Sequence, residues 1–228
     1  MNRILLVLGC LAIGAGCATV PFEPVPLEPL GDVTAEQLRR SVAATAPQRF
    51  AVLQSAVFEY RGRAMALVCM TEIDVPEGSF SVVGMTPMGV KLFEIRGRDG
   101  HLDESFVAPG LDEWDGVAEA IAGDIQRVYF DSLPAAAARA HVWRRQALFR
   151  APKDGGRLEH IVAGKPPVLI RKRLDDRQGT VWDVNYAEYT EHEGELHAGG
   201  IVLTHRRYGY RLILRLKEIL PMTPRAVR

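Results

Sequence analysis

Histidine and glutamate side chains gather in one short stretch of the chain, which reads His192-Glu193-Gly194-Glu195-Leu196-His197. Imidazole nitrogens and carboxylate oxygens are ligands that zinc and related metals use, so this stretch could bind a metal ion. The Glu-Gly pair at its centre is typical of a hairpin turn, however, and no further histidine follows at a recognisable ligand spacing. A solvated turn is the interpretation that we prefer, with a metal site as the alternative.

Patterns that mark catalytic sites are absent from the sequence. It has no Gly-x-Ser-x-Gly elbow, no Walker loop, no Rossmann glycine fingerprint and no His-Glu-x-x-His. Ser79 and Ser81 alternate on a predicted strand with no marked base partner. The chain carries 28 basic and 28 acidic residues, and this balance does not suggest a nucleic-acid surface. We therefore predict a protein that is not an enzyme, has no cofactor and binds no nucleic acid.

A cysteine near the N-terminus is the residue with the clearest chemical role. Arg3 is followed by an uncharged run from Ile4 to Ile13, and Gly14-Ala15-Gly16 then leads to Cys17. A positive region, an apolar run and small residues are the layout of a secretory signal peptide, and this run is too short to span a bilayer. We predict that residues 1–16 are the signal peptide. Cleavage after Ala18 is the alternative, because small residues also precede that bond.

The same segment resembles the lipobox of bacterial lipoproteins, in which the cysteine is acylated. The resemblance implies a covalent lipid on Cys17 as the only attached group, although Gly14 stands where the motif usually has a larger apolar residue. Inner-membrane retention usually reads an aspartate after the cysteine. This chain has Ala18, which implies the periplasmic face of the outer membrane. Cys10 leaves with the signal, and the apolar neighbours of Cys69 predict a buried structural thiol.

The chain after the cysteine divides into three parts. Four prolines between Pro21 and Pro29 exclude a helix and predict an extended tether that holds the domain off the bilayer. Thr34 and Gln37 match a capping box, which predicts a short helix ending near Pro47. The predicted parts are residues 17–33 as lipidated cysteine and tether, 34–220 as one domain and 221–228 as a tail.

Short runs of alternating apolar residues predict antiparallel strands joined by tight turns. They cover residues 50–60, 65–75, 79–85, 90–96, 102–107, 142–150, 158–163, 168–174, 181–189, 201–205 and 208–220. A long helix interrupts them, with Asp112 as its predicted N-cap. Its apolar stripe is Trp114, Val117, Ile121, Ile125, Val128 and Tyr129, and its small residues Ala118, Ala122 and Gly123 allow close packing.

This order of elements resembles the LolA/LolB lipoprotein-carrier superfamily, and is closest to the LolB-like outer-membrane lipoproteins with their uncharacterised relatives. The segments that carry the resemblance are Phe80 to Ile95, Trp182 to Tyr186, Gly200 to Thr204 and Tyr210 to Leu216. It implies a mainly β (α+β) fold. A single curved antiparallel sheet of about 10 to 11 strands forms an incomplete barrel, and helices lie across its open side.

In that superfamily the concave face encloses acyl chains, which implies that this chain takes part in lipoprotein or lipid transfer at the outer membrane. The implied partners are membrane lipid or lipoprotein acyl chains and a periplasmic LolA-like donor, and we expect a monomer. The turn Pro87-Met88-Gly89 is the implied membrane-insertion loop. The candidate cavity lining is Trp114, Ile121, Ile125, Trp182, Tyr186, Tyr210, Leu212 and Leu214.

Alternating apolar residues are equally compatible with a core that is filled by side chains. A structural or interaction lipoprotein of the envelope is therefore the alternative function. A transfer protein for glycolipid or polyene lipid is a third reading, which shares the cavity and differs in its cargo.

Overall fold

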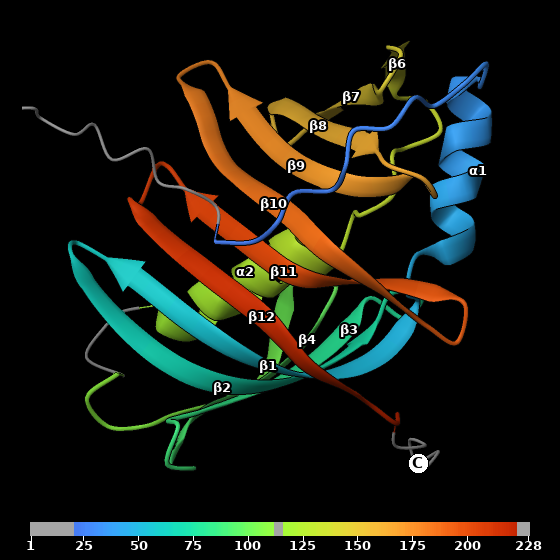
Figure 1. Cartoon of the computed structure of the whole chain (residues 1–228). Coiled ribbons are helices and arrows are strands. Elements are labelled where there is room, and N and C mark those ends of the chain that lie inside the picture. The colour runs from blue at the N-terminus through green and yellow to red at the C-terminus, as the bar shows by residue number, and fades with distance from the viewer. Residues whose placement is uncertain (1–20, 112–115, 223–228) are drawn as a thin grey trace, which may run out of the picture.

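The computed structural model describes residues 21–111 and 116–222, so Cys17, Asp112 and Trp114 lie outside the described residues. This part of the chain forms twelve strands and two helices (Figure 1). Their bounds are α1 Ala35–Thr45, β1 Arg49–Tyr60, β2 Arg63–Asp74, β3 Ser79–Met85, β4 Lys91–Arg98, β5 His101–Val107, α2 Val117–Tyr129, β6 Arg139–Val142, β7 Gln146–Lys153, β8 Gly156–Ala163, β9 Val168–Asp176, β10 Gly179–His192, β11 Glu195–His205 and β12 Tyr210–Leu220.

All twelve strands belong to one antiparallel sheet with the order β5-β4-β3-β2-β1-β12-β11-β10-β9-β8-β7-β6. Two meanders, β1 to β5 and β6 to β12, join where β1 pairs with β12. Among the described strands β5 and β6 are the free edges, so the sheet curves without closing (Figure 1). The predicted fold class, a mainly β chain with an incomplete antiparallel barrel, is confirmed.

The sheet contains twelve strands where about 10 to 11 were expected. The difference lies at the predicted strand 142–150, which covers the last residue of β6, the connection and most of β7, so that β6 was missed. β6 ends at Val142, the Trp143 amide donates to the Gln146 carbonyl oxygen at 2.8 Å, and β7 begins at Gln146. All four residues of β6 are exposed, so β6 lacks the alternation by which the other strands were found.

Helix α2 crosses the concave face of the sheet and contacts β4, β5 and β11. Its buried face includes Ala118 and Ala122, whose small side chains let the helix lie close to the strands. The predicted N-cap, Asp112, is wrong. The helix begins after Gly116, whose φ of 75° lies in the left-handed region that favours glycine and turns the chain into the helix.

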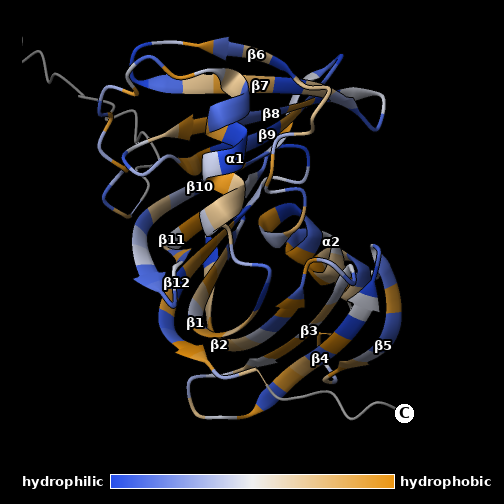
Figure 2. Cartoon of the chain, turned by 90° about the vertical axis from the view of Figure 1, so that its right-hand side faces the viewer, coloured by the Kyte–Doolittle hydropathy of each residue, from blue (hydrophilic) through white to orange (hydrophobic). Residues whose placement is uncertain are grey.

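Helix α1 covers the concave face of the other meander. The capping box is confirmed, because the Gln37 amide donates to Thr34 Oγ1 at 3.2 Å and the Thr34 amide donates to Gln37 Oε1 at 2.8 Å. Leu38 and Val42 are buried against Phe149 of β7 in a second apolar cluster. Figure 2 shows both helices on the inner side of the curved sheet, whose strands alternate between hydrophobic and hydrophilic residues.

Residues 21–33, the N-terminal segment, are docked on the sheet and do not form the free spacer that was expected. Phe22 is buried against Ala187 and Val202 on the convex face. The ring fits there because Gly200 has no side chain, since a Cβ at that position would lie 2.3 Å from the ring. Arg215 stacks over the ring at 4.6 Å.

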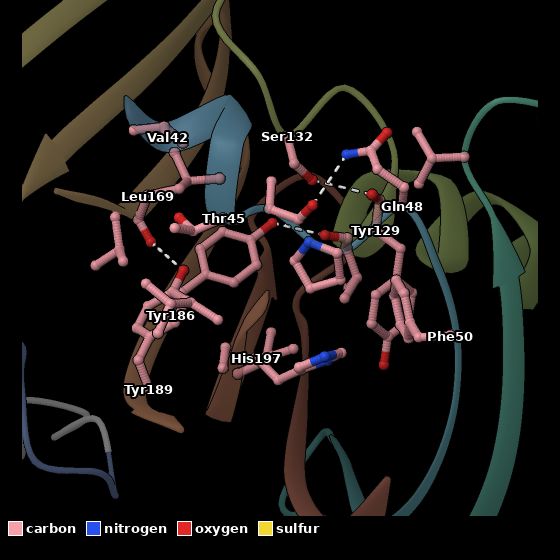
Figure 3. A pocket seen from close by; sticks show the side chains of 18 of the residues that line it. Val42, Thr45, Gln48, Phe50, Tyr129, Ser132, Leu169, Tyr186, Tyr189 and His197 are labelled. Atoms are coloured by element: carbon pink, nitrogen blue, oxygen red, sulfur yellow. Dashed lines mark hydrogen bonds between the residues drawn. The ribbon is translucent and has the colours of Figure 1, made fainter. Parts of the chain in front are cut away.

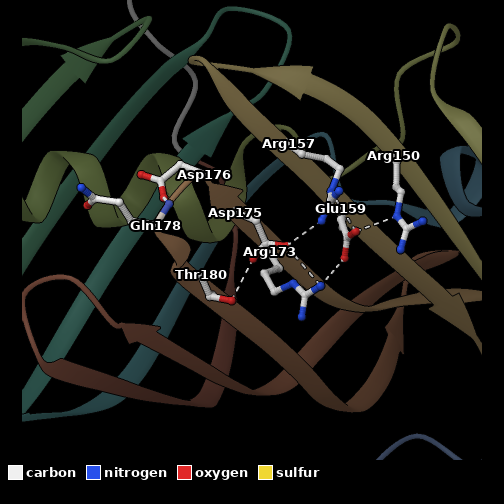
Figure 4. Close-up of polar contacts among 8 residues, drawn as sticks. All are labelled: Arg150, Arg157, Glu159, Arg173, Asp175, Asp176, Gln178 and Thr180. Atoms are coloured by element: carbon white, nitrogen blue, oxygen red, sulfur yellow. Dashed lines mark hydrogen bonds and ion pairs between the residues drawn. The ribbon is translucent and has the colours of Figure 1, made fainter.

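The convex face of β7, β8 and β9 carries a network of ion pairs (Figure 4). Glu159 is only 3% exposed, and the side chains of Arg150, Arg157 and Arg173 approach it at 2.7, 3.2 and 2.6 Å. Arg173 and Arg157 also pair with Asp175, at 3.2 and 3.4 Å. Each buried carboxylate oxygen therefore has a partner, and this outer face is polar while the inner face is apolar.

Candidate functional site

A cavity of about 340 Å³ opens at one end of the half-barrel, beside the C-terminal ends of both helices (Figure 3). This volume is near the lower limit of the range of about 300 to 1,000 Å³ that ligand pockets occupy. The lining residues are Val42, Thr45, Ala46, Pro47, Gln48, Phe50, Val52, Gln54, Val75, Val128, Tyr129, Asp131, Ser132, Leu133, Val168, Leu169, Tyr186, Tyr189, Leu196, His197, Ala198, Ile201 and Leu216.

Aromatic rings build much of the wall. Phe50, at the start of β1, meets Tyr129 edge-on with ring centroids 5.8 Å apart. It meets His197 of β11 in the same manner at 5.5 Å. Edge-to-face contacts of this kind hold the rings in defined orientations. The aliphatic side chains of β9 and β11 complete a surface that is mostly hydrocarbon.

The hydroxyl groups of three tyrosines in the wall already have partners, and Figure 3 shows the hydrogen bonds of Tyr186 and Tyr189. Tyr129 donates to Gln54 Oε1 at 2.5 Å, Tyr186 to the Val128 carbonyl oxygen at 2.7 Å and Tyr189 to the Leu169 carbonyl oxygen at 2.6 Å. Burial raises the pKa of all three phenols. They therefore remain protonated and contribute their rings to the cavity as apolar surface.

The segment that follows α2 forms one side of the cavity through Asp131, Ser132 and Leu133. Two buried basic side chains hold its backbone. Lys172 of β9 donates to the Phe130 carbonyl oxygen at 2.5 Å, and His160 Nε2 of β8 lies 2.7 Å from the Asp131 carbonyl oxygen. Burial lowers the pKa of Lys172 to about 7 and that of His160 to about 4. At neutral pH the imidazole is therefore uncharged, while the amine is close to the midpoint of its titration.

The polar groups near the cavity already have hydrogen-bond partners, so a ligand does not need polar groups to pair with them. Gln48 Nε2 donates to the Ala46 carbonyl oxygen at 3.1 Å, and Ser132 Oγ donates to the Tyr129 carbonyl oxygen at 2.9 Å. Burial lowers the pKa of His197, and the nearby His192 adds to this effect, so the imidazole is neutral at neutral pH. A pocket with apolar walls and paired polar groups suits an uncharged, hydrophobic ligand.

The residues predicted to line a cavity lie in several places. Tyr186 lines this pocket. Ile125, Trp182 and Leu214 are buried in the main core cluster, while Ile121, Tyr210 and Leu212 are half-buried against it. Trp114 lies outside the described residues. The centre of the half-barrel is therefore packed with side chains, and this apolar cavity lies at one end of it.

Sequence reasoning missed most of the residues that line the pocket, among them Phe50, Tyr129 and Tyr189. Their aromatic side chains stand at the ends of elements: Phe50 near the start of β1 and Tyr129 at the last position of α2. A bulky aromatic residue at the boundary of an element was the available signal. Periodicity does not reveal it, because periodicity assigns a residue to a face and not to an end of the sheet.

The predicted membrane-insertion loop lies at the opposite end of the sheet. Met85, the last residue of β3, pairs with Val68 in the first half of β2. The β3–β4 turn therefore lies at the same end of the sheet as the β1–β2 turn. Met88 is 87% exposed at the tip of this turn, and Val90 is 60% exposed. The Gly89 amide donates to the Thr86 carbonyl oxygen at 2.9 Å. The β1–β2, β3–β4 and β11–β12 turns lie at this end of the sheet, which we call the turn end. The opposite end, where the cavity opens, is called the pocket end.

The histidine stretch also lies at the pocket end, where His192 and Glu195 flank the β10–β11 turn. Within residues 21–111 and 116–222, no three histidine, cysteine or acidic side chains are grouped so that they could hold a metal ion. Over the same residues, neither helix has the length and apolar character needed to cross a membrane.

One family matches the sequence of this chain. Its model, described as "Protein of unknown function (DUF3261)", matches residues 51–218, which include β2 to β11 in full and all but the outermost residues of β1 and β12. No curated protein matches the sequence.

Three solved structures share the fold at low sequence identity. A LolA superfamily protein from Nitrosomonas europaea has a TM-score of 0.56 at 12% identity, over 84% of this chain and 96% of that one. A putative outer membrane lipoprotein-sorting protein domain from Vibrio parahaemolyticus has a TM-score of 0.53 at 12% identity, over 83% and 91%. A DUF1329 family protein from Desulfovibrio piger has a TM-score of 0.52 at 11% identity, over 83% and 92%.

Proposed function

We propose that this chain, which belongs to the DUF3261 family, is a LolB-like outer-membrane lipoprotein that encloses an acyl chain in the cavity at the pocket end. The observation that carries the proposal is an apolar cavity with its buried hydroxyl groups already paired. The shared fold with a LolA superfamily protein and with a lipoprotein-sorting domain supports it. The proposed role is binding and transfer, without catalysis and without a cofactor other than the lipid on Cys17.

The free energy of hydrocarbon transfer explains why such a protein needs an enclosed site. A chain of about ten methylenes costs about 8 kcal/mol when it is exposed to water, at roughly 0.8 kcal/mol for each group. Hydrogen bonds do not offset this cost, whereas the rings of Phe50, Tyr129 and Tyr189 do. We propose lipoprotein acyl chains or membrane lipid as cargo, delivered to a monomer by a periplasmic LolA-like donor. Glycolipid and polyene lipid are cargoes of the same chemistry.

The first experiment measures binding of a fluorescent fatty-acid analogue to the purified chain with Cys17→Ala, which can be handled without detergent. Ala198 lines the cavity, and Ala198→Trp places an indole in the space. We expect at least a tenfold loss of affinity, the difference that about 1.4 kcal/mol produces. Ala66→Trp is the matched control, because Ala66 is exposed on β2. Equal binding by both variants, or no binding by the parent, would falsify the proposal.

The second experiment concerns Met88, for which we propose contact with the bilayer. Met88→Glu places a charge on a side chain that is 87% exposed and makes few contacts, so folding should survive. Transfer of cargo into vesicles should fail, while binding of the fatty-acid analogue should persist. Val142→Glu, on an exposed residue of the edge strand β6, is the control. Transfer at the parent rate by Met88→Glu would remove the insertion role.

The anchor has a separate test. Cys17 lies outside the described residues, so its lipidation is proposed from the sequence alone. Cells that express the chain should incorporate labelled palmitate into it, and Cys17→Ala should abolish the label and release the protein from the outer membrane. Label that persists in Cys17→Ala would place the modification elsewhere.

The packed centre of the half-barrel favours a second candidate, a structural or interaction lipoprotein of the envelope. Trp182, Ile125 and Leu214 belong to one buried cluster that links the sheet to α2. A protein of this kind would carry no lipid after purification. Native mass spectrometry distinguishes the two candidates, because only a carrier retains a bound lipid that the fatty-acid analogue displaces.

A further inference from the structure

A second hollow lies at the turn end, between the β1–β2 and β11–β12 turns. β1 pairs with β12 up to Tyr60↔Tyr210, and the two turns separate beyond this pair. The cleft between them has a volume of about 560 Å³. Gly62 and Gly209, with φ of 74° and 69°, allow the tight turns that form its two sides.

Four guanidinium groups line this cleft, those of Arg61, Arg63, Arg206 and Arg211, and they face a single carboxylate, that of Glu59. Arg211 lies 3.4 Å from Glu59, and Arg206 lies 3.4 Å from the buried Asp183 behind the cleft. Among the described residues, Arg61 and Arg63 have no carboxylate within ion-pair distance. Positive charge therefore exceeds negative charge in the cleft, although the whole chain is neutral.

The backbone of the β11–β12 turn, on one side of the cleft, is held in place by local contacts. The amides of Arg206 and Arg207 both donate to the Val181 carbonyl oxygen, at 2.9 and 3.3 Å. His205 lies beneath, stacked between Tyr208 and Tyr210 at 4.5 and 5.1 Å. Burial lowers the pKa of His205 to about 4, so at neutral pH the arginines provide the positive charge.

We infer that this cleft binds the phosphate of an anionic lipid headgroup. Guanidinium groups bind phosphate oxygens in pairs of parallel hydrogen bonds, and arginine remains charged at every physiological pH. Arg61 and Arg63 are the groups that we expect to make these bonds. Free phosphate shares the chemistry of the headgroup, and the experiment below separates the two sources.

The location of the cleft supports a membrane ligand, and this step rests on the proposed function. The exposed Met88 lies at the same end of the sheet. The N-terminal segment runs from Phe22 toward the pocket end, where a Cβ on Gly164 would touch Val25 and the Leu30 amide donates to the Arg144 carbonyl oxygen. Five chain steps separate Phe22 from Cys17, a reach of about 18 Å. A lipid on Cys17 can therefore sit in the bilayer while the turn end contacts the bilayer surface.

The test measures co-sedimentation of the Cys17→Ala chain with vesicles. Phosphatidylcholine vesicles are compared with vesicles that also contain phosphatidylglycerol. The variant is Arg61→Gln with Arg63→Gln. The matched control is Arg144→Gln with Arg145→Gln, two exposed arginines in the β6–β7 connection that lose the same charge at the pocket end. We expect the parent to prefer phosphatidylglycerol, and the variant to lose about 30-fold in affinity, the loss that two arginines produce at an anionic surface.

Raised salt should weaken the parent's binding, because ions screen charges that face water. Equal binding to both vesicle types, or equal losses in variant and control, would overturn the inference.

A second experiment measures the binding of inorganic phosphate to the parent and to the variant by titration. Phosphate that binds the parent but not the variant, together with no preference between vesicles, assigns the site to free phosphate and overturns the lipid part. Binding of the fatty-acid analogue should be the same in parent and variant, so failure here is distinct from failure of the pocket proposal.

Discussion

The two ends of the half-barrel are built from the same strands and differ in what covers them. At the pocket end, the C-terminal ends of α1 and α2 lie over the strands, and the buried Phe50 and the half-buried Tyr129 line a cavity. At the turn end, the turns extend into solvent and carry Met88, Tyr208 and arginine side chains. One curved sheet can therefore offer a hydrophobic pocket and a charged, exposed rim, because the C-terminal ends of both helices lie over the same end of it.

The largest expected contrast between the ends is in stability. Phe149 has no exposed surface and packs beneath α1 near the pocket end, so Phe149→Ala should cost about 3 to 5 kcal/mol of unfolding free energy. Met88→Ala at the turn end should change it by less than about 0.5 kcal/mol. Urea denaturation followed by circular dichroism gives both values. Similar losses in the two variants would contradict the contrast.

The next contrast is in pH dependence. The pKa of the buried Lys172 is lowered to about 7 from its ordinary 10.5. Between these values only the unfolded chain binds the proton, so the parent should gain stability as the pH rises through this window. Lys172→Met should remove the gain. Lys91→Met, on an exposed lysine at the turn end, should keep it. Thermal denaturation across the window tests this, and parallel curves for the parent and Lys172→Met would exclude the effect.

A smaller contrast concerns single hydroxyl groups. Tyr186→Phe removes the donor to the Val128 carbonyl oxygen and leaves that buried acceptor unpaired, which should cost about 1 to 3 kcal/mol. Tyr208 at the turn end is 64% exposed, so Tyr208→Phe should be close to neutral. The comparison uses the midpoints of urea unfolding. If Tyr208→Phe is the more damaging change, the hydroxyl groups of the pocket wall are not structural.

The smallest contrast compares two threonine side chains that bond to backbone amides. Thr34→Ala removes the cap of α1 and should cost about 1 kcal/mol. Thr86 Oγ1 accepts from the Val90 amide at 3.1 Å within the Met88 turn, and Thr86→Ala should affect that turn alone. Hydrogen exchange should quicken at Val90 in the second variant without a change in global stability. Global destabilisation by Thr86→Ala would mean that the turn belongs to the cooperative core.

Local features could be predicted from the sequence where the interaction spans a few residues. The capping box at Thr34 and Gln37 identified α1 because both of its hydrogen bonds lie within one turn. Alternation over residues 208–220 predicted a strand, which is confirmed as β12, whereas its pairing with β1 is a result of the structure. The start of α2 was wrong by several residues, since Gly116 begins the helix through its backbone conformation without a side-chain cap.

The candidate site was harder to predict. Of the residues expected to line a cavity, Tyr186 does so, while Trp182 and Leu214 pack in the core. All three point to the concave face, as their alternation indicates. Whether a concave residue meets another side chain or open space depends on the path of α2 and of the segment after it. Lys172 and His160 hold that segment across about thirty to forty residues of sequence, a separation at which spacing has no predictive value.

Periodicity and turn residues along the chain were sufficient to assign most strands and their faces, because each depends on neighbours within a few residues, whereas the exposed position of Met88 followed from the family resemblance. The place of the cavity, the docking of Phe22 on Gly200 and the grouping of Arg61 and Arg63 with Arg206 came only from the folded chain. These features join residues that are distant in sequence, and the curvature of the sheet and the position of its helices bring them together.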